Sequence, residues 1–226
     1  MTQNHVRIIV ETIDDVIGDI SMYSASAILV IGWLLHFWKK YDQKYVPILL
    51  LFLASAGCDW LAVILKEEYK NNMPAFHLYG LLHGLILVWF FSMIIRTRKA
   101  LIQIGSLYLV FYIINSAFLE SIFTYNAIAK VTQNAFFIIL SFWYFFDVYK
   151  YETNLELESS GIFWIVVGIL IYHSGALFSS LFSAKILSGN NDRLFSTWVV
   201  HNIAGTIKNL LFLLGLWMGR TRLRTK

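Results

Sequence analysis

Long apolar runs alternate with short polar breaks along most of this chain. A bilayer core about 30 Å thick is crossed by about 20 apolar residues in a helix. Seven runs approach or exceed that length, and we expect each to span a membrane. They are Ile20–Trp38, Tyr45–Leu65, Met73–Ile95, Ala100–Phe118, Ala127–Val148, Gly161–Leu187 and Phe195–Gly219. Because the breaks are short, consecutive helices must be antiparallel neighbours, which predicts an all-α integral membrane protein, a seven-transmembrane-helix up-down bundle.

The two ends of the chain predict short flanking segments. In residues 1–19, apolar side chains recur at helical spacing among acidic ones, which predicts an amphipathic helix on the membrane surface. This segment lacks the basic start and continuous apolar stretch of a signal peptide. Residues 220–226 are strongly basic. We therefore divide the chain into an interfacial segment (1–19), a seven-helix domain (20–219) and a basic cytoplasmic tail (220–226).

Lysine and arginine are shared unequally between the two sides of the predicted bundle. Eleven fall on the side of the C-terminus and six on the other, with Lys208 inside the last run. Cytoplasmic loops carry the excess of basic residues in membrane proteins. The bias predicts an outside N-terminus and a cytoplasmic C-terminus, and we expect a multi-pass protein of the plasma (inner) membrane.

Composition supports the membrane assignment and excludes other classes. Hydrophobic residues make up 58% of the chain and charged residues 14%, against about 45–50% and about 25% in soluble domains. The net charge of +4 does not indicate nucleic-acid binding, because the basic residues sit at the ends of apolar runs. The single cysteine, Cys58, allows no intrachain disulfide and no cysteine-rich metal site.

Polar residues inside the apolar runs are the candidates for function. Ionisable groups within spans are rare and mark functional sites by default. A rise of 1.5 Å per residue puts Lys208, His83 and His173 within about 3 Å of the midplane. Four more lie roughly 5–10 Å toward the outside, namely Asp59, Asn115, Asn134 and His201. His77, Lys130 and Glu120 lie nearer the outer surface. The predicted ligand-binding residues are Lys208, His173, His83, His201, Asp59, Asn202, Asn134 and Asn115.

This distribution predicts a polar pocket open to the outside and closed by Phe, Leu and Trp toward the cytoplasm. His201 and Lys208 are seven residues apart and share one face of the last helix. Asp59 is the most plausible carboxylate partner for Lys208, with His173 alongside. The alternative interpretation is structural, because buried histidines and asparagines also join helices by hydrogen bonds.

The preferred function is a receptor or sensor with an outward-facing pocket for a small ligand or cofactor. Lys208 and the histidines would supply charge and donors to an anionic or amphipathic ligand, and aromatic side chains would form the walls. Buried histidines could also titrate and act as a pH switch. A cytoplasmic signalling partner would then dock on the short inner loops or on the tail.

Four other functions remain open, and so does whether the protein is an enzyme. His83, His173, His201 and Asp59 could bind zinc or another metal ion, as in a membrane hydrolase, although no HxxxH pair is present. Lys208 could hold retinal as a Schiff base, but Ala204 stands where a carboxylate would be expected one turn earlier. His83 and His173 could ligate haem. The fourth function is that of a small transporter, although the sequence lacks the inverted repeat that many transporters show.

Overall fold

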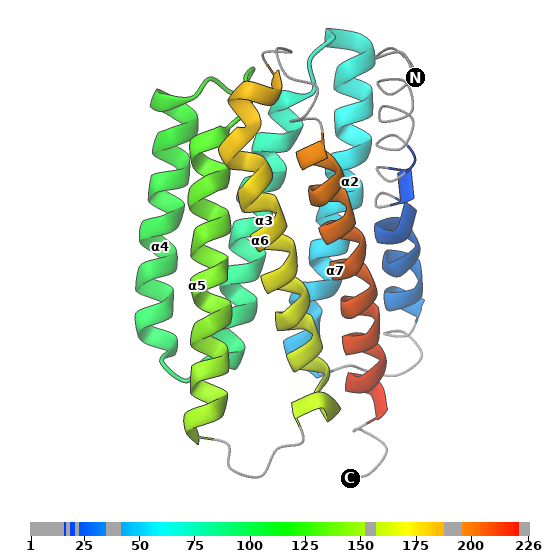
Figure 1. Ribbon diagram of the computed structural model, residues 1–226, viewed down its shortest axis with the longest axis vertical. Helices are drawn as coiled ribbons and strands as arrows, with labels where there is room; N and C mark the ends of the chain where they lie inside the picture. Colours follow the sequence, from blue (N-terminus) through cyan, green and yellow to red (C-terminus); the bar gives the residue numbers. More distant parts are fainter. Residues whose placement is uncertain are drawn as a thin grey trace, which may run out of the picture.

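A computed structural model describes Val16, Asp19, Ile20 and residues 23–34, 42–151, 157–187 and 196–221. Every secondary-structure element in these residues is helical, and the long helices stand side by side along one axis (Figure 1). A helix over Tyr23–Leu34 comes first. It is followed by η1 (Gln43–Tyr45), α2 (Val46–Tyr69), α3 (Met73–Ile94), α4 (Arg98–Ile114), η2 (Asn115–Leu119), α5 (Ala127–Tyr151), η3 (Leu157–Ser159), α6 (Gly161–Leu187) and α7 (Ser196–Thr221).

The long helices coincide with the last six predicted spans, and each is long and apolar enough to cross a bilayer. Of the first predicted span, the described part, Tyr23–Leu34, is a shorter apolar helix. The predicted segment 1–19 lies outside the described residues except at Val16 and Asp19, and so does the tail from residue 222. Large apolar side chains such as Leu107 (71% exposed) cover the outside of the bundle. These features indicate a multi-pass membrane protein.

Proline starts both α2 and α3, and Asn71 fixes the turn between these helices. Pro47 and Pro74 each stand in the first turn of their helix, where the missing backbone N–H costs no hydrogen bond. Lys70 ends α2 with a left-handed backbone (φ 56°), and the side chain of Asn71 accepts the backbone N–H of Met73 at 2.9 Å. We call the end of the bundle that carries this turn and the α4–α5 loop the upper end, as drawn in Figure 1.

The helices pack in a closed order around the interior. α3 contacts α2, α4 and α5, while α6 packs between α5 and α7. The helix Tyr23–Leu34 joins α7 to α2: Asn209 donates to Ser24 Oγ at 2.8 Å, and Gly32 lies against Leu49 and Leu216. α4 stands at the edge of the bundle (Figure 1).

Small residues allow α6 and α7 to approach until their backbones touch. A Cβ atom added to Gly175 would lie 2.7 Å from Ala204 Cβ, and one added to Gly215 would lie 2.6 Å from the carbonyl oxygen of Gly161. Small residues at such contacts are typical of helix pairs in membranes, where close packing drives association. We call Gly161, Gly175, Ala204 and Gly215 the glycine seam.

The apolar core fills the lower part of the bundle. Phe52 and Phe212 meet edge to face with ring centroids 5.7 Å apart, and Phe91 stacks on Phe137 at 6.2 Å. Fully buried aliphatic side chains complete it, among them Ile48, Leu49, Leu87, Leu101, Leu140, Ile165 and Leu216. Polar side chains therefore gather above this core, toward the upper end.

Candidate functional site

A group of buried and half-buried polar side chains from α3, α5, α6 and α7 lies above the apolar core. It includes five of the eight predicted ligand-binding residues and two that the sequence analysis did not select. We call it the polar core; it consists of His83, Gln133, Asn134, Tyr172, His173, His201 and Lys208.

His173 on α6 is 1% exposed and bonds across the bundle to α5. Its Nδ1 lies 2.8 Å from Asn134 Oδ1, while Asn134 Nδ2 donates to Ser180 Oγ at 3.2 Å. With this amide orientation, Nδ1 carries the ring proton of a neutral imidazole, and Nε2 keeps a lone pair. Nε2 is buried and has no hydrogen-bond partner among the described residues.

His83 on α3 has the opposite tautomer. Gln133 Nε2 donates to the carbonyl oxygen of Gly80 at 2.9 Å, which fixes the orientation of the amide, because a carbonyl oxygen only accepts. The same Nε2 lies 3.4 Å from His83 Nδ1, so Nδ1 accepts and the proton is on Nε2. The rings of His83 and His173 meet edge to face, with centroids 5.2 Å apart.

Lys208 lies in the bundle interior with 9% of its surface exposed. Its ammonium group stands 4.5 Å from the ring centroid of Tyr172 and 5.8 Å from that of Phe212, which are cation–π distances. The Tyr172 ring also contacts His173 at 5.1 Å and His201 at 5.4 Å. Tyr172 is therefore the side chain through which Lys208 and two histidines meet.

Asp59 on α2 is half-buried and faces the same interior. Its carboxylate interacts electrostatically with Lys208 and hydrogen-bonds to Ser55. The structure thus brings the two predicted partners near each other, but within the described residues no direct ion pair within 4.0 Å joins them.

Two other predicted residues lie elsewhere. Asn115 lies apart from the polar core, in the π-helical turn η2 at the upper end of α4, and donates to Glu120 Oε2 at 2.7 Å; its role in ligand binding stays a prediction. The π-helical turn and this bond hold Asn115 against the α4–α5 loop. Asn202 is half-buried beside His201, and its carbonyl oxygen accepts from Thr206 Oγ1 at 3.0 Å.

A second set of polar contacts fixes the α4–α5 loop. Glu120 caps α5 by accepting the N–H groups of Ile128 at 3.0 Å and Ala129 at 3.3 Å; a carboxylate is favoured at a helix N-terminus. His77 reaches the carbonyl oxygen of Thr124 at 3.0 Å. The remaining contacts are Tyr112 to the His77 carbonyl, Asn126 to Tyr112 and Asn71 to the Phe123 carbonyl. These residues have structural roles.

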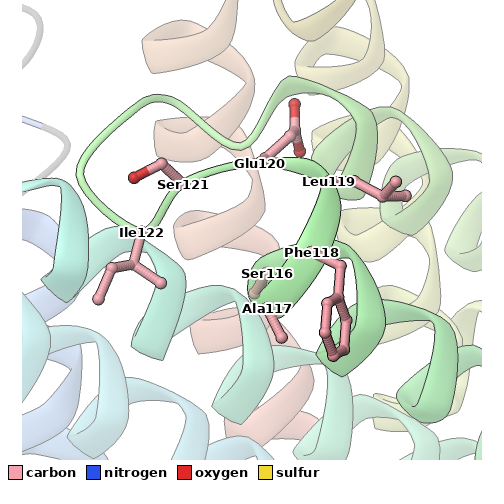
Figure 2. A pocket seen from close by; sticks show the side chains of 7 residues that line it. All are labelled: Ser116, Ala117, Phe118, Leu119, Glu120, Ser121 and Ile122. Carbon is pink, nitrogen blue, oxygen red and sulfur yellow. The ribbon is translucent and has the colours of Figure 1, made fainter.

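The one pocket described for this structure lies on the same loop. It is an open hollow of about 530 Å³ lined by residues 116–122. Figure 2 shows that its lining comes from a single continuous segment at the end of α4. None of the predicted site residues lines it, so the predicted outward-facing pocket above Lys208 is not the hollow that the structure shows.

The metal and haem interpretations receive no support from the geometry. Within the described part of the chain, no three His, Cys, Asp or Glu side chains are grouped so that they could hold a metal ion. His83 and His173 are in direct ring contact, which leaves no room for a haem between them. That these two histidines could be axial ligands of one haem stays a prediction, without support from these contacts.

Sequence reasoning placed Lys130 near the outer surface and did not connect it to the site. Lys130 is in the first turns of α5, with its ammonium 5.4 Å from the ring centroid of Phe76 and 5.1 Å from that of Tyr125. Its charge acts on the rings of both His83 and His201, as that of Lys208 does. The burial of Tyr125, in the α4–α5 loop, raises its pKa, so the phenol stays neutral.

The polar core combines a lysine side chain, imidazole rings and aromatic ring faces. Such a set can bind the polar group of a small molecule whose apolar part lies against the rings. The chain matches no family model, no curated protein and no solved structure. A functional proposal therefore depends on these contacts alone.

Proposed function

We propose that this protein is a membrane receptor or sensor that binds a small ligand in the polar core, beside Lys208. The observation that carries the proposal is the surroundings of the Lys208 ammonium. Aromatic rings face it, and among the described residues no hydrogen-bond acceptor is within bonding distance. An ammonium has three N–H donors, and leaving them unpaired in a membrane interior is unfavourable. A ligand with an acceptor group would satisfy them.

The neighbouring groups support the same role. The buried Nε2 of His173 offers a lone pair without a partner in the described residues, so it can accept from a ligand hydroxyl or amine. His83, His201, Asn134, Asn202 and Asp59 complete the proposed site. We place the protein in the plasma membrane with its lower end in the cytoplasm, where a partner docking on the loops would carry the signal.

Thermal unfolding in lipid nanodiscs tests the proposal. The probes are benzoate, benzamide and benzylamine, which share a phenyl ring and differ in charge. At least one should raise the unfolding midpoint, by roughly 5–10 °C at a concentration one hundred times its dissociation constant. Lys208→Met should abolish the shift, while Lys66→Met, which removes an exposed lysine of α2, should leave it intact.

Two further measurements complete the test. Lys208→Arg keeps the positive charge and shows whether the loss in Lys208→Met reflects misfolding, since both variants can be compared by circular dichroism without probe. Native mass spectrometry of the wild type would show any small molecule that copurifies. If none of the probes shifts the midpoint and no molecule copurifies, or if the shift survives Lys208→Met, the proposal is wrong.

A second candidate function is retinal binding through a Schiff base on Lys208. The specific observation in its favour is Asp59, a carboxylate that interacts with Lys208 and would act as the counterion. Adding all-trans-retinal to the purified protein should then produce a visible absorption band. Lys208→Arg should remove the band, because a guanidinium keeps the charge but forms no Schiff base. A colourless wild type after incubation would exclude this function.

A further inference from the structure

The adjoining rings of His83 and His173 each keep one nitrogen for a further hydrogen bond, and the two nitrogens are of opposite kind. Asn134 occupies Nδ1 of His173, so the buried lone pair of Nε2 has no partner in the described residues. Gln133 donates to Nδ1 of His83, and the Nε2–H group of that ring has no acceptor in the described part of the chain. His173 therefore lacks a donor, and His83 lacks an acceptor.

Two further aromatic rings touch both imidazoles. Phe137 has its ring centroid 5.0 Å from that of His173 and 6.0 Å from that of His83. The corresponding distances for Tyr172 are 5.1 Å and 6.2 Å, and the two imidazole centroids are 5.2 Å apart. A molecule whose apolar part lies against these two rings would bring its polar end to the two unpaired nitrogens.

Only some polar groups can satisfy both nitrogens. A carboxylate only accepts and leaves Nε2 of His173 unpaired, while an ammonium only donates and leaves the Nε2–H group of His83 unpaired. A buried polar group without a partner is costly. A hydroxyl or a primary amide both accepts and donates. One oxygen with two hydrogen bonds of about 2.9 Å joins nitrogens up to about 5.8 Å apart, which suits two rings in direct contact.

We propose that the ligand of the polar core is a neutral molecule with an apolar or aromatic body and a hydroxyl or primary amide, which accepts from His83 Nε2 and donates to His173 Nε2. This inference rests on the proposed function, which leaves the polar group of the ligand open. The body of the ligand lies against the rings of Phe137 and Tyr172. The second lone pair of its oxygen accepts from Lys208, whose ammonium stands 4.5 Å from the same Tyr172 ring centroid.

The three probes separate this inference from the proposed function. Benzamide should raise the unfolding midpoint in nanodiscs, while benzoate and benzylamine, which is protonated at neutral pH, should leave it unchanged. If benzoate or benzylamine raises the midpoint as much as benzamide does and needs Lys208, the proposed function stands and this inference is wrong. If no probe acts and nothing copurifies, the proposed function itself has failed, and this inference fails with it.

Acetophenone is the matched ligand for benzamide. It keeps the phenyl ring and the carbonyl acceptor, and a methyl group replaces the amide nitrogen with its two donors. Titration of the midpoint shift should show that acetophenone binds the wild type about tenfold or more weakly than benzamide does, because Nε2 of His173 then stays unpaired. Equal affinities of the two ligands would overturn the inference.

Variants of the two histidines identify the nitrogen that recognises the donor. His173→Phe keeps a ring without Nε2, and His173→Asn keeps an N–H group next to Cγ that can still donate to Asn134. The preference for benzamide should disappear in both. His83→Phe removes a donor that both ligands use, so it should weaken both and leave the preference. Ser174→Ala, at an exposed position of α6, should change neither affinity.

Circular dichroism without ligand checks that each variant folds. A folded His173 variant that still prefers benzamide as strongly as the wild type does would overturn the role of His173. If neither variant of His173 folds, the comparison of benzamide with acetophenone on the wild type decides the inference.

Discussion

Tyr172 occupies the centre of the polar core, with the Lys208 ammonium on its ring face and two histidine rings in contact. A cation over a desolvated aromatic ring contributes about 2 kcal/mol. The ring, rather than the phenol hydroxyl, makes these contacts. Tyr172 therefore contributes to the stability of the folded bundle and also forms part of the proposed ligand site.

This arrangement predicts different results for two substitutions of Tyr172. Tyr172→Phe keeps the ring and should change the free energy of unfolding by less than about 0.5 kcal/mol. Tyr172→Leu removes the ring face and should lower it by about 2 kcal/mol or more, since the Lys208 ammonium loses its principal contact. Unfolding in a mixed-micelle denaturant series measures both. Equal effects of the two substitutions would show that the cation–π contact is unimportant.

Sequence could identify the residues that are costly to bury in a membrane, but not those that surround them. Lys208, His173 and His83 stand out because each is polar within an apolar run. Tyr172 and Gln133 do not stand out in the same way, since aromatic and amide side chains are common in spans and their partners depend on how each helix is rotated. That Asn115 bonds to the α4–α5 loop rather than to the polar core could not be read from the sequence, because η2, a π-helical turn, follows no pattern of apolar residues.

At the scale of the elements, the hydropathy of the sequence shows where the helices form. Which helices touch depends instead on the shapes of the surfaces that their side chains make. The last six predicted spans correspond to α2–α7 because each must be apolar over the thickness of a bilayer. The glycine seam between α6 and α7 was not predicted, because glycine is common in membrane helices and spacing alone does not show which partner a glycine faces. Contacts between backbones become visible only when two helices are placed together.

The glycine seam predicts that replacing Gly215 destabilises the bundle, whereas replacing Gly57, which lies outside the seam, does not. Gly215→Val would force side-chain atoms against the backbone of Gly161 and the side chain of Ile165, and should cost about 1–3 kcal/mol by overpacking. Gly57→Val is the matched control, because a Cβ there meets no atom within 4 Å. Thermal unfolding in nanodiscs compares the two. A control that is as destabilised as Gly215→Val would mean that the seam is not the cause.

At the scale of the whole molecule, the excess of basic residues on one side remains a prediction of orientation. It can be tested in a Cys58→Ala background that carries one new cysteine at a time. Asn71→Cys, at the upper end, should react with a membrane-impermeant maleimide applied to intact cells. Thr225→Cys, in the basic tail, should react only after the membrane is permeabilised. The reverse pattern would show that the C-terminus is outside.

The glycine seam also determines how the bundle can move. Since the backbones of α6 and α7 touch at Gly161 and Gly215, and Gly175 lies against the Cβ atom of Ala204, the two helices cannot slide past each other without steric overlap. We therefore expect the pair to move as one unit that carries the main-chain positions of His173 and Lys208. A conformational change on ligand binding must therefore shift this pair against α2, α3 and α5. Such a shift would move the ends of the pair at both membrane surfaces together, which is how a change inside the bilayer would be detected outside it.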